Sequence, residues 1–152
     1  MKIQPLNRKE AGKILEQIEK EYGCNPKSLL IDRYTFFQSD KNKIYIVNNL
    51  IKEFDFSQMR INSFGLYLCE INRGNIRLSI EGSQLLGKHC KKNILEIDEE
   101  ISKQWMMGND IPSEKEFNGF VIIKNNNDYM GSGKYKEGVI LNFVSKQRRI
   151  KE

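Results

Sequence analysis

Apolar positions near the start of the chain recur with the spacing of an amphipathic helix. Between residues 7 and 22 they share one face of a helix with about 3.6 residues per turn. These positions are Ala11, Ile14, Leu15, Ile18 and Tyr22. Asn7 followed by Glu10 matches a capping box, and Gly23 is a typical stop signal. The pattern therefore predicts one helix over residues 7–22 with a buried face.

Short apolar runs follow this helix, and turn-like polar segments separate them. The runs cover residues 29–31, 34–37, 44–47, 64–71 and 76–80. The polar link 38–42 predicts a hairpin between two of the runs, and residues 73–75 predict a tight turn between two others. Segments 48–54 and 81–87 predict short helices. The first half therefore has the element order of a small α+β domain.

A polar segment at residues 88–93 separates this pattern from a new one. A strand is expected to begin at once, over residues 94–97. We therefore predict two domains, an N-terminal α+β domain over residues 1–90 and a second domain over residues 91–152.

The second domain begins with a strand and a helix. Asp98 predicts the N-cap of that helix, and Gly108 predicts its end. Trp105 shares one helical face with Ile101, and an indole in that position normally packs inward. We therefore expect Trp105 to be a core or inter-domain anchor rather than a platform on which a base stacks.

Residues 119–150 predict a small, strongly bent antiparallel sheet. The expected strands are 120–123, a strand beginning near Tyr129, and 139–144. A polar turn over residues 125–128 joins the first two. Gly131 and Gly133 interrupt the second strand, and glycine in a strand usually marks a bulge, a barrel corner or a close approach of another backbone.

Positive charge is concentrated at the C-terminal end. The chain has 152 residues and a formal net charge of +5, and residues 134–152 contain six basic residues against two acidic ones. This local excess favours a polyanionic partner, because each neutralised phosphate releases condensed counterions. A solvated basic tail that maintains solubility is the plainer alternative. If this end is a strand, Arg148 and Arg149 face opposite sides, and which of them meets the partner stays open.

The remaining composition is that of a globular protein. The apolar content is 39%, and no apolar run approaches the ~20 residues that span a bilayer. The N-terminal residues lack the apolar core of a signal peptide. We therefore expect a soluble, cytoplasmic protein with no membrane partner.

Few residue patterns point to catalysis or to a bound cofactor. The three cysteines are far apart in the chain, so reduced thiols are expected rather than disulfides or a zinc site. They are Cys24, Cys69 and Cys90. The single histidine, His89, does not complete a metal site. Residues 131–134 depart from a phosphate-binding loop, because Tyr135 stands where serine or threonine would bind magnesium. We expect no cofactor, no metal and no enzymatic activity.

Three segments of the C-terminal half resemble the PUA RNA-binding domain. They read Gly119-Phe120-Val121-Ile122, Tyr129-Met130-Gly131-Ser132-Gly133-Lys134 and Asn142-Phe143-Val144-Ser145-Lys146-Gln147-Arg148-Arg149-Ile150. The resemblance covers roughly residues 92–152 and is closest to the PUA tails of Sun/fmu-type archaeal RNA 5-methylcytosine methyltransferases. Small Nip-type ribosome-biogenesis proteins share that tail, and their preceding domain has an element order similar to the first half of this chain. The family often has proline where this chain has Ser145.

The resemblance implies a fold and a function. The implied fold class is α+β. A small N-terminal α/β domain, like the one that precedes PUA in the Nip-type proteins, is followed by a PUA β pseudo-barrel. The implied partner is structured RNA, either ribosomal or transfer RNA, and the implied role is that of an accessory factor in ribosome biogenesis or RNA modification. In the methyltransferases the catalytic cysteine lies in a Pro-Cys context within a separate, larger domain. None of the cysteines here has that context.

The candidate RNA-binding residues are basic side chains, two strand glycines and a loop that flanks the RNA-binding groove in the family. They are Gly108, Asp110, Gly131, Gly133, Lys134, Lys146, Arg148 and Arg149. Gly131 and Gly133 have two interpretations, an approach of the RNA backbone to the sheet or barrel curvature alone. The alternative function is a protein-interaction adaptor that docks on a ribosome-assembly factor or an RNA-modifying enzyme. An RNA-modifying enzyme with an unrecognised site is the third hypothesis.

Overall fold

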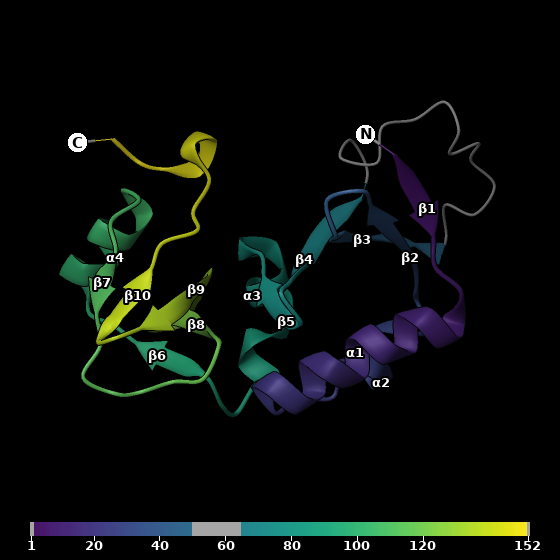
Figure 1. Cartoon of the computed structure of the whole chain (residues 1–152), viewed down its shortest axis with the longest axis horizontal. Helices are drawn as coiled ribbons and strands as arrows, with labels where there is room; N and C mark the ends of the chain where they lie inside the picture. The colour runs from purple at the N-terminus through teal and green to yellow at the C-terminus, as the bar shows by residue number, and fades with distance from the viewer. Residues whose placement is uncertain (1, 50–64, 152) are drawn as a thin grey trace.

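The described part of the chain forms two five-stranded sheets with four α-helices around them. A computed structural model describes residues 2–49 and 65–151, and the elements run from right to left across Figure 1. The first half contains β1 (Ile3–Pro5), α1 (Arg8–Tyr22), α2 (Pro26–Leu30), β2 (Tyr34–Ser39), β3 (Lys43–Asn48), β4 (Leu66–Asn72), β5 (Asn75–Leu78) and α3 (Ile80–Leu86). After the short 3₁₀ helix η4 (Gly87–His89) come β6 (Ile94–Glu96), α4 (Glu99–Met106), β7 (Ile111–Pro112), β8 (Phe120–Asn125), β9 (Asp128–Lys136), β10 (Val139–Leu141) and the 3₁₀ helix η5 (Lys146–Arg148).

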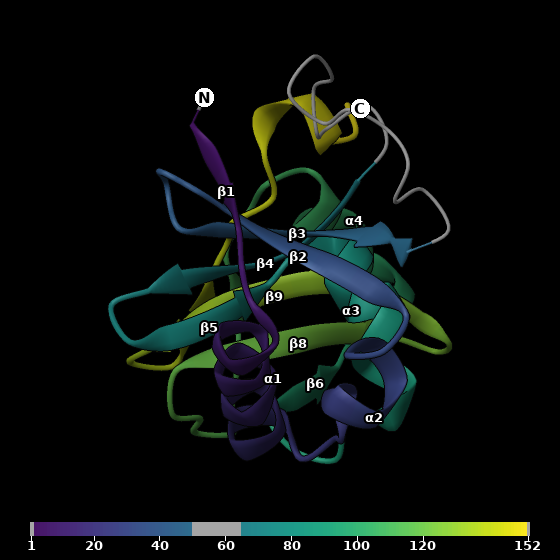
Figure 2. The same cartoon turned by 90° about the vertical axis from the view of Figure 1, so that its right-hand side faces the viewer.

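The first sheet has the order β1-β2-β3-β4-β5 and is antiparallel throughout. Helix α1 lies below it in Figures 1 and 2. The helix begins with the predicted capping box, because the Asn7 side chain accepts from the Glu10 N–H and the Glu10 carboxylate accepts from the Asn7 N–H. Gly23 ends it with φ of 70°. The predicted helix and hairpin are therefore confirmed.

The turn between β4 and β5 and the helix after β5 lie where the sequence predicts them. The tight turn between β4 and β5 has positive φ at both Arg73 and Gly74, as a two-residue hairpin turn requires. The helix expected over 81–87 is α3. The helix expected over 48–54 and the start of the strand expected over 64–71 lie largely outside the described residues.

The second sheet has the order β6-β8-β9-β10-β7, in which β6 pairs in parallel with β8 and the other pairs are antiparallel. The antiparallel arrangement predicted for residues 119–150 holds for β8, β9 and β10. The third strand is shorter than predicted, since it ends at Leu141 rather than at residue 144. The basic end does not continue as a strand, because residues 146–148 form a 3₁₀ helix, so the strand alternation considered for Arg148 and Arg149 does not apply.

The two halves pack tightly against each other. Helix α3 packs on β9, Ile80 of α3 contacts the hydrophobic cluster of the second sheet, and Ile122 of β8 belongs to the cluster of the first. The predicted boundary near residue 90 falls between the two sheets, and the division into two domains stays a prediction. The fold is α+β, with the second sheet curved as a pseudo-barrel.

Trp105 belongs to the hydrophobic cluster of the second sheet. Its side chain is fully buried, and its Nε1–H donates to the backbone oxygen of Met130 at 2.8 Å. The predicted core role is confirmed. None of the described helices is long and apolar enough to cross a membrane.

Candidate nucleic-acid interface

Residues 142–150, here called the C-terminal arm, leave β10 and run to the upper edge of the molecule in Figure 1. The arm has little regular structure of its own, so its position depends on contacts with the rest of the fold. At its far end the Ile150 N–H donates to the Met106 carbonyl of α4 at 2.9 Å. The far end of the arm is therefore anchored on α4.

Asn142 anchors the start of the arm. Its Nδ2 donates to the carbonyl oxygens of Trp105 and Asn109 at 2.8 and 2.9 Å, and its Oδ1 accepts from the Val144 N–H at 2.7 Å. The Asn142 N–H donates to Asp110 Oδ1 at 2.8 Å. This side chain binds one carbonyl in the last turn of α4 and one just beyond its end, and it replaces the strand hydrogen bonds that would have extended β10. The Asp110 side chain therefore positions the arm by accepting from the backbone N–H of Asn142.

Arg148 lies on η5 and reaches back to the first half of the chain. Its guanidinium forms an ion pair with Glu81 in the first turn of α3. The Arg148 side chain is 47% exposed and that of Glu81 is 34% exposed. The pair links the arm to α3 while leaving the arginine accessible from solvent.

Arg149 packs in the opposite direction, onto the end of α4. Its Nε donates to the Val144 carbonyl at 3.0 Å, and it lies against Gly108. Gly108 has φ of 97°, and a Cβ there would come within 2.4 Å of the Arg149 Nε. Gly108 is therefore the residue that admits the arginine. The two arginines do diverge, but through a 3₁₀ turn rather than through strand alternation.

The two predicted lysines differ in setting. Lys146 is exposed on η5. Lys134 is partly exposed on β9, where it pairs with Phe120 and Leu141 of the neighbouring strands. The Phe120 ring lies 5.6 Å from that of Phe143 in the arm, so Lys134 sits next to the arm at its beginning.

Gly131 and Gly133 are buried and approach other parts of the same chain. Gly131 has φ of 82°, and a Cβ there would lie 3.2 Å from the Ile80 side chain. A Cβ on Gly133 would lie 2.3 Å from the Leu141 carbonyl oxygen and 2.6 Å from the Trp105 ring. The structure therefore favours the interpretation in terms of curvature and close packing, and it places both glycines inside rather than on the surface with the cations.

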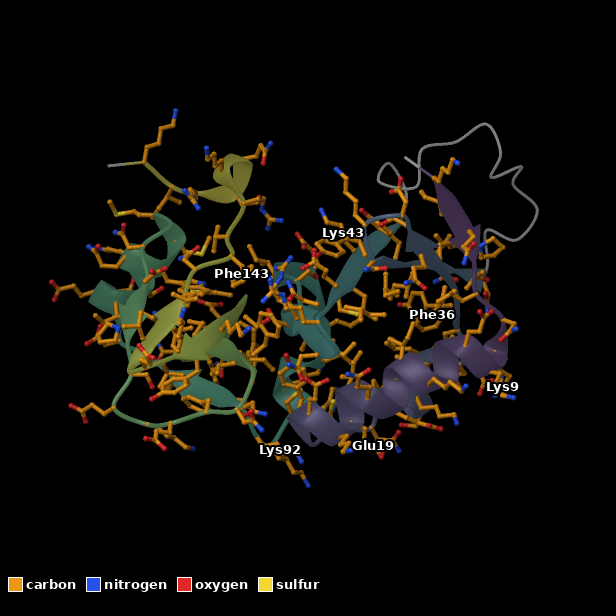
Figure 3. The ribbon with its side chains drawn as sticks, viewed as in Figure 1. Lys9, Glu19, Phe36, Lys43, Lys92 and Phe143 are labelled. Carbon is orange, nitrogen blue, oxygen red and sulfur yellow. The ribbon has the colours of Figure 1, made fainter. Side chains whose placement is uncertain are left out.

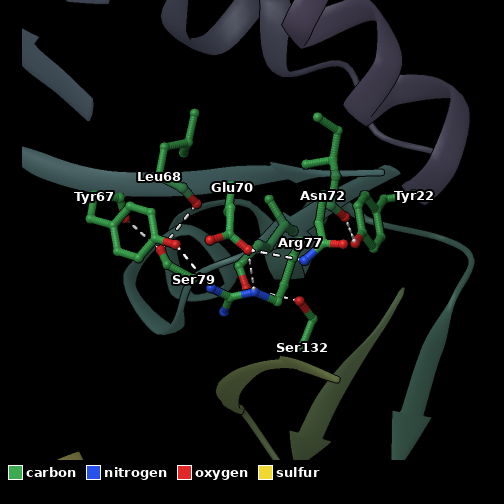
Figure 4. A network of polar contacts seen from close by, with 10 residues as sticks. Tyr22, Tyr67, Leu68, Glu70, Asn72, Arg77, Ser79 and Ser132 are labelled. Atoms are coloured by element: carbon green, nitrogen blue, oxygen red, sulfur yellow. Dashed lines mark hydrogen bonds and ion pairs between the residues drawn. The ribbon is translucent and has the colours of Figure 1, made fainter. Parts of the chain in front are cut away.

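Sequence reasoning missed a polar network at the junction of the two sheets, which Figure 4 shows around Arg77. The Arg77 Nη2 donates to the Tyr67 hydroxyl at 3.0 Å, and its Nε lies 3.4 Å from Glu70. The guanidinium carbon also lies 5.1 Å from the centroid of the Phe143 ring. Burial raises the pKa of Tyr67 well above its usual range, and the nearby Arg77 opposes that shift. These residues come together through the register of β4 and β5 and the path of the arm, and neither can be inferred from a local sequence pattern.

The cysteines are free and buried, as expected. Complete burial raises the pKa of the Cys69 thiol, and a hydrogen bond with Cys24 together with burial raises that of Cys90. Among residues 2–49 and 65–151, no group of three or more histidine, cysteine or acidic residues is arranged to hold a metal ion.

Comparison with known proteins gives one family match and several relatives. Residues 92–150 match the family described as the methyltransferase RsmF PUA domain. Ribosomal RNA small subunit methyltransferase F of Aeromonas salmonicida is 24% identical over 144 residues, which are 94% of this chain and 29% of the relative. The protein of the same name from Vibrio vulnificus is 23% identical over 106 residues, 70% of this chain and 22% of the relative. The chain thus spans less than a third of the length of these relatives.

A solved structure extends the likeness to both halves of the fold. A hypothetical protein of the hyperthermophilic archaeon Pyrococcus horikoshii OT3 superposes with a TM-score of 0.60 at 13% sequence identity. The superposition covers 96% of this chain and 97% of the archaeal one. The two-part fold is therefore shared over nearly the whole of both chains.

Proposed function

We propose that this chain, in which residues 92–150 are a PUA domain resembling the tails of RsmF methyltransferases, binds structured RNA through its C-terminal arm. The observation that carries the proposal is the anchoring of the arm. Hydrogen bonds from Asn142 and Ile150 and the contacts of two arginines hold a cationic segment at the surface. A preorganised segment loses less conformational entropy on binding than a mobile tail would.

The arm offers groups that suit a phosphate backbone. Lys146 and Arg148 are exposed, and an arginine can make two parallel hydrogen bonds to one phosphate. Arg149 uses its Nε inside the protein, which leaves the terminal nitrogens of a firmly placed guanidinium for a ligand. Lys134 extends the positive surface along β9. Double-stranded RNA is recognised largely through shape, phosphates and 2′-hydroxyls, which is the recognition these groups support.

The proposed setting is ribosomal RNA modification. The relatives carry the name of a small-subunit ribosomal RNA methyltransferase, and residues 92–150 of this chain match the PUA domain of that methyltransferase family. We propose that these 152 residues recognise RNA as an accessory module and do not themselves catalyse a reaction. Gly108 and Asp110 serve the site by shaping the path of the arm.

The salt dependence of RNA binding tests this proposal. The probe is a hairpin RNA of about sixteen base pairs, the length that a shape-reading module spans. Replacing Lys146 and Arg148 by glutamine should lower the slope of log K against log salt by roughly 1.5, since each phosphate contact contributes about 0.7–0.9. The matched control replaces Lys9 and Lys13 of α1 by glutamine, which changes the net charge equally at a remote surface (Figure 3 labels Lys9).

Two outcomes would count against the proposal. Equal affinity of the arm variant and the parent at every salt concentration would remove the arm from the site. Failure of the parent chain to bind the hairpin would refute RNA binding by this fold and favour the hypothesis of a protein-interaction adaptor.

A further inference from the structure

Cations and aromatic rings alternate across the junction between the two sheets. The Lys43 ammonium lies 5.3 Å from the centroid of the Tyr67 ring, and the Tyr67 hydroxyl accepts from Arg77 at 3.0 Å. Arg77 in turn lies 5.1 Å from the centroid of the Phe143 ring. These four residues, here called the junction ladder, come from β3, β4, β5 and the C-terminal arm.

The junction ladder lies on the side of the first sheet that faces away from α1. Side chains alternate between the two faces along β2 and β3. Phe36 and Ile46 pack in the cluster that includes the buried face of α1. On the other face of the sheet lies a separate cluster of Phe37, Tyr45 and Val47. Tyr67 packs against this second cluster, with its ring 5.5 Å from that of Tyr45. Lys43, Tyr67 and Phe143 are all partly exposed, so the ladder forms part of the surface.

The ladder is continuous with the cations of the arm. Phe143 itself belongs to the arm and lies one residue beyond Asn142. On the other side, β5 leads directly into α3 at Ser79, and Glu81 in the first turn of α3 holds Arg148. A ligand on Lys146 and Arg148 therefore has the junction ladder as its next surface toward the first half of the chain. Figure 3 shows Phe143 and Lys43 near this junction, remote from Lys9 at the far end of α1.

Each member of the ladder has a distinct physical role. Arg77 is only 13% exposed and its charge is offset by Glu70, so it orients the two rings rather than binding a ligand. The rings supply apolar surface, and the Lys43 ammonium lies over the Tyr67 ring on a flexible side chain that can turn from the ring to a phosphate. This combination of stacking faces and positive charge is the chemistry of single-stranded nucleic acid binding, in which base–aromatic stacking contributes about 1–3 kcal/mol per base. An acidic peptide would use the cations but not the ring faces.

We propose that the junction ladder binds unpaired nucleotides that flank the RNA helix held by the C-terminal arm. This inference rests on the proposed function, since it places a single-stranded extension on a surface next to the arm. It assigns the first half of the chain a direct part in binding, with Lys43 contacting a phosphate and the rings of Tyr67 and Phe143 stacking on bases.

Two RNA probes separate this inference from the proposed function. One is the blunt hairpin of about sixteen base pairs, and the other is the same hairpin with an unpaired adenosine extension at its 3′ or 5′ end. Affinities are measured by fluorescence anisotropy. The parent chain should bind one of the extended probes about tenfold more tightly than the blunt one, equivalent to ~1.4 kcal/mol.

Substitutions locate the gain. Lys43→Gln and Phe143→Leu should each remove most of the preference for the extended probe. Lys43→Gln, on β3 and outside the arm, should leave binding of the blunt hairpin unchanged. The matched control is Phe117→Leu, because the Phe117 ring also carries a lysine, Lys115, at 5.2 Å and contacts Tyr135 at 6.2 Å. This control should keep the preference.

The results distinguish failure of this inference from failure of the proposed function. Binding of both probes with equal affinity, or a preference that survives Lys43→Gln and Phe143→Leu, would overturn the inference while leaving the proposed function intact. Absence of binding to either probe would overturn both. A loss of blunt-hairpin binding in Phe143→Leu would mark that ring as a support of the arm, and Lys43→Gln would then decide.

Discussion

The ion pair between Arg148 and Glu81 allows a test that moves RNA affinity upward rather than downward. If Arg148 binds phosphate, the carboxylate of Glu81 competes with the RNA for the same guanidinium. Glu81→Gln removes the competing negative charge, while the amide oxygen of glutamine can still accept from Arg148 and keep the arm anchored. The variant should therefore bind the hairpin RNA more tightly than the parent chain does.

The size of the gain follows from the exposure of the pair. Both side chains are substantially exposed, at 47% and 34%, so solvent and salt screen the interaction. Exposed pairs contribute about 0.2–1 kcal/mol, which corresponds to an increase in affinity of roughly 1.4- to 5-fold. The same range bounds the loss of folding stability. The gain should shrink between about 50 and 200 mM salt as screening increases.

A double-mutant cycle isolates the direct effect. Glu81→Gln also removes one negative charge, and that general effect persists when Arg148 is already glutamine. We expect the gain from Glu81→Gln to be smaller in the Arg148→Gln background. Fluorescence anisotropy measures the four affinities, and thermal denaturation confirms that each variant folds. Glu19→Gln, on the exposed side of α1 in Figure 3, is the matched control for net charge.

Two results would refute this reasoning. Equal gains in both backgrounds would show that Arg148 does not meet the RNA. Weaker binding of Glu81→Gln in a fully folded variant would show that Glu81 orients Arg148 for the ligand instead of competing with it.

Three further predictions concern the support of the site. Asn142→Ala should lower stability by about 1–3 kcal/mol, because it removes three side-chain hydrogen bonds, to the Trp105 and Asn109 carbonyls and from the Val144 N–H. It should also weaken RNA binding with no change in charge; urea unfolding and anisotropy measure the two effects. Gly133→Ala should lower stability by more than about 1 kcal/mol, because its Cβ would overlap Leu141 and Trp105, and unchanged stability would contradict the packing. Burial raises the pKa of Glu21, so the folded state binds its proton more tightly than the unfolded state does. Stability therefore falls as the pH rises from the pKa of the unfolded state, about 4.3, through the pKa of the folded state. Glu21→Gln should flatten that part of the stability–pH curve.

Local patterns were enough to predict the elements whose signals lie within a few residues. The capping box of Asn7 and Glu10, the stop at Gly23 and the turn before Asn75 all appear where the sequence indicated them. Trp105 was expected inside because of its helical spacing, and it is buried. Such features depend on backbone preferences and on periodicity, which a single sequence records.

The arm could not be predicted in the same way, because its contacts are distant in sequence. Apolar residues after Val139 favoured a strand to residue 144, whereas β10 ends at Leu141 and the Asn142 side chain bonds to carbonyls at the end of α4 and just after it. Arg148 pairs with Glu81, which lies 67 positions earlier. The junction ladder likewise needs the register of three strands. No local periodicity of the sequence predicts these long-range contacts.

Amide chemical-shift mapping tests the central claim most directly, since it asks which residues of the intact chain meet RNA. The ¹⁵N-labelled chain is titrated with the blunt hairpin RNA. Our account predicts that the largest shifts fall on residues 143–149, with smaller shifts at Lys134. Shifts confined to α1 and α2, or an unchanged spectrum at saturating RNA, would contradict it.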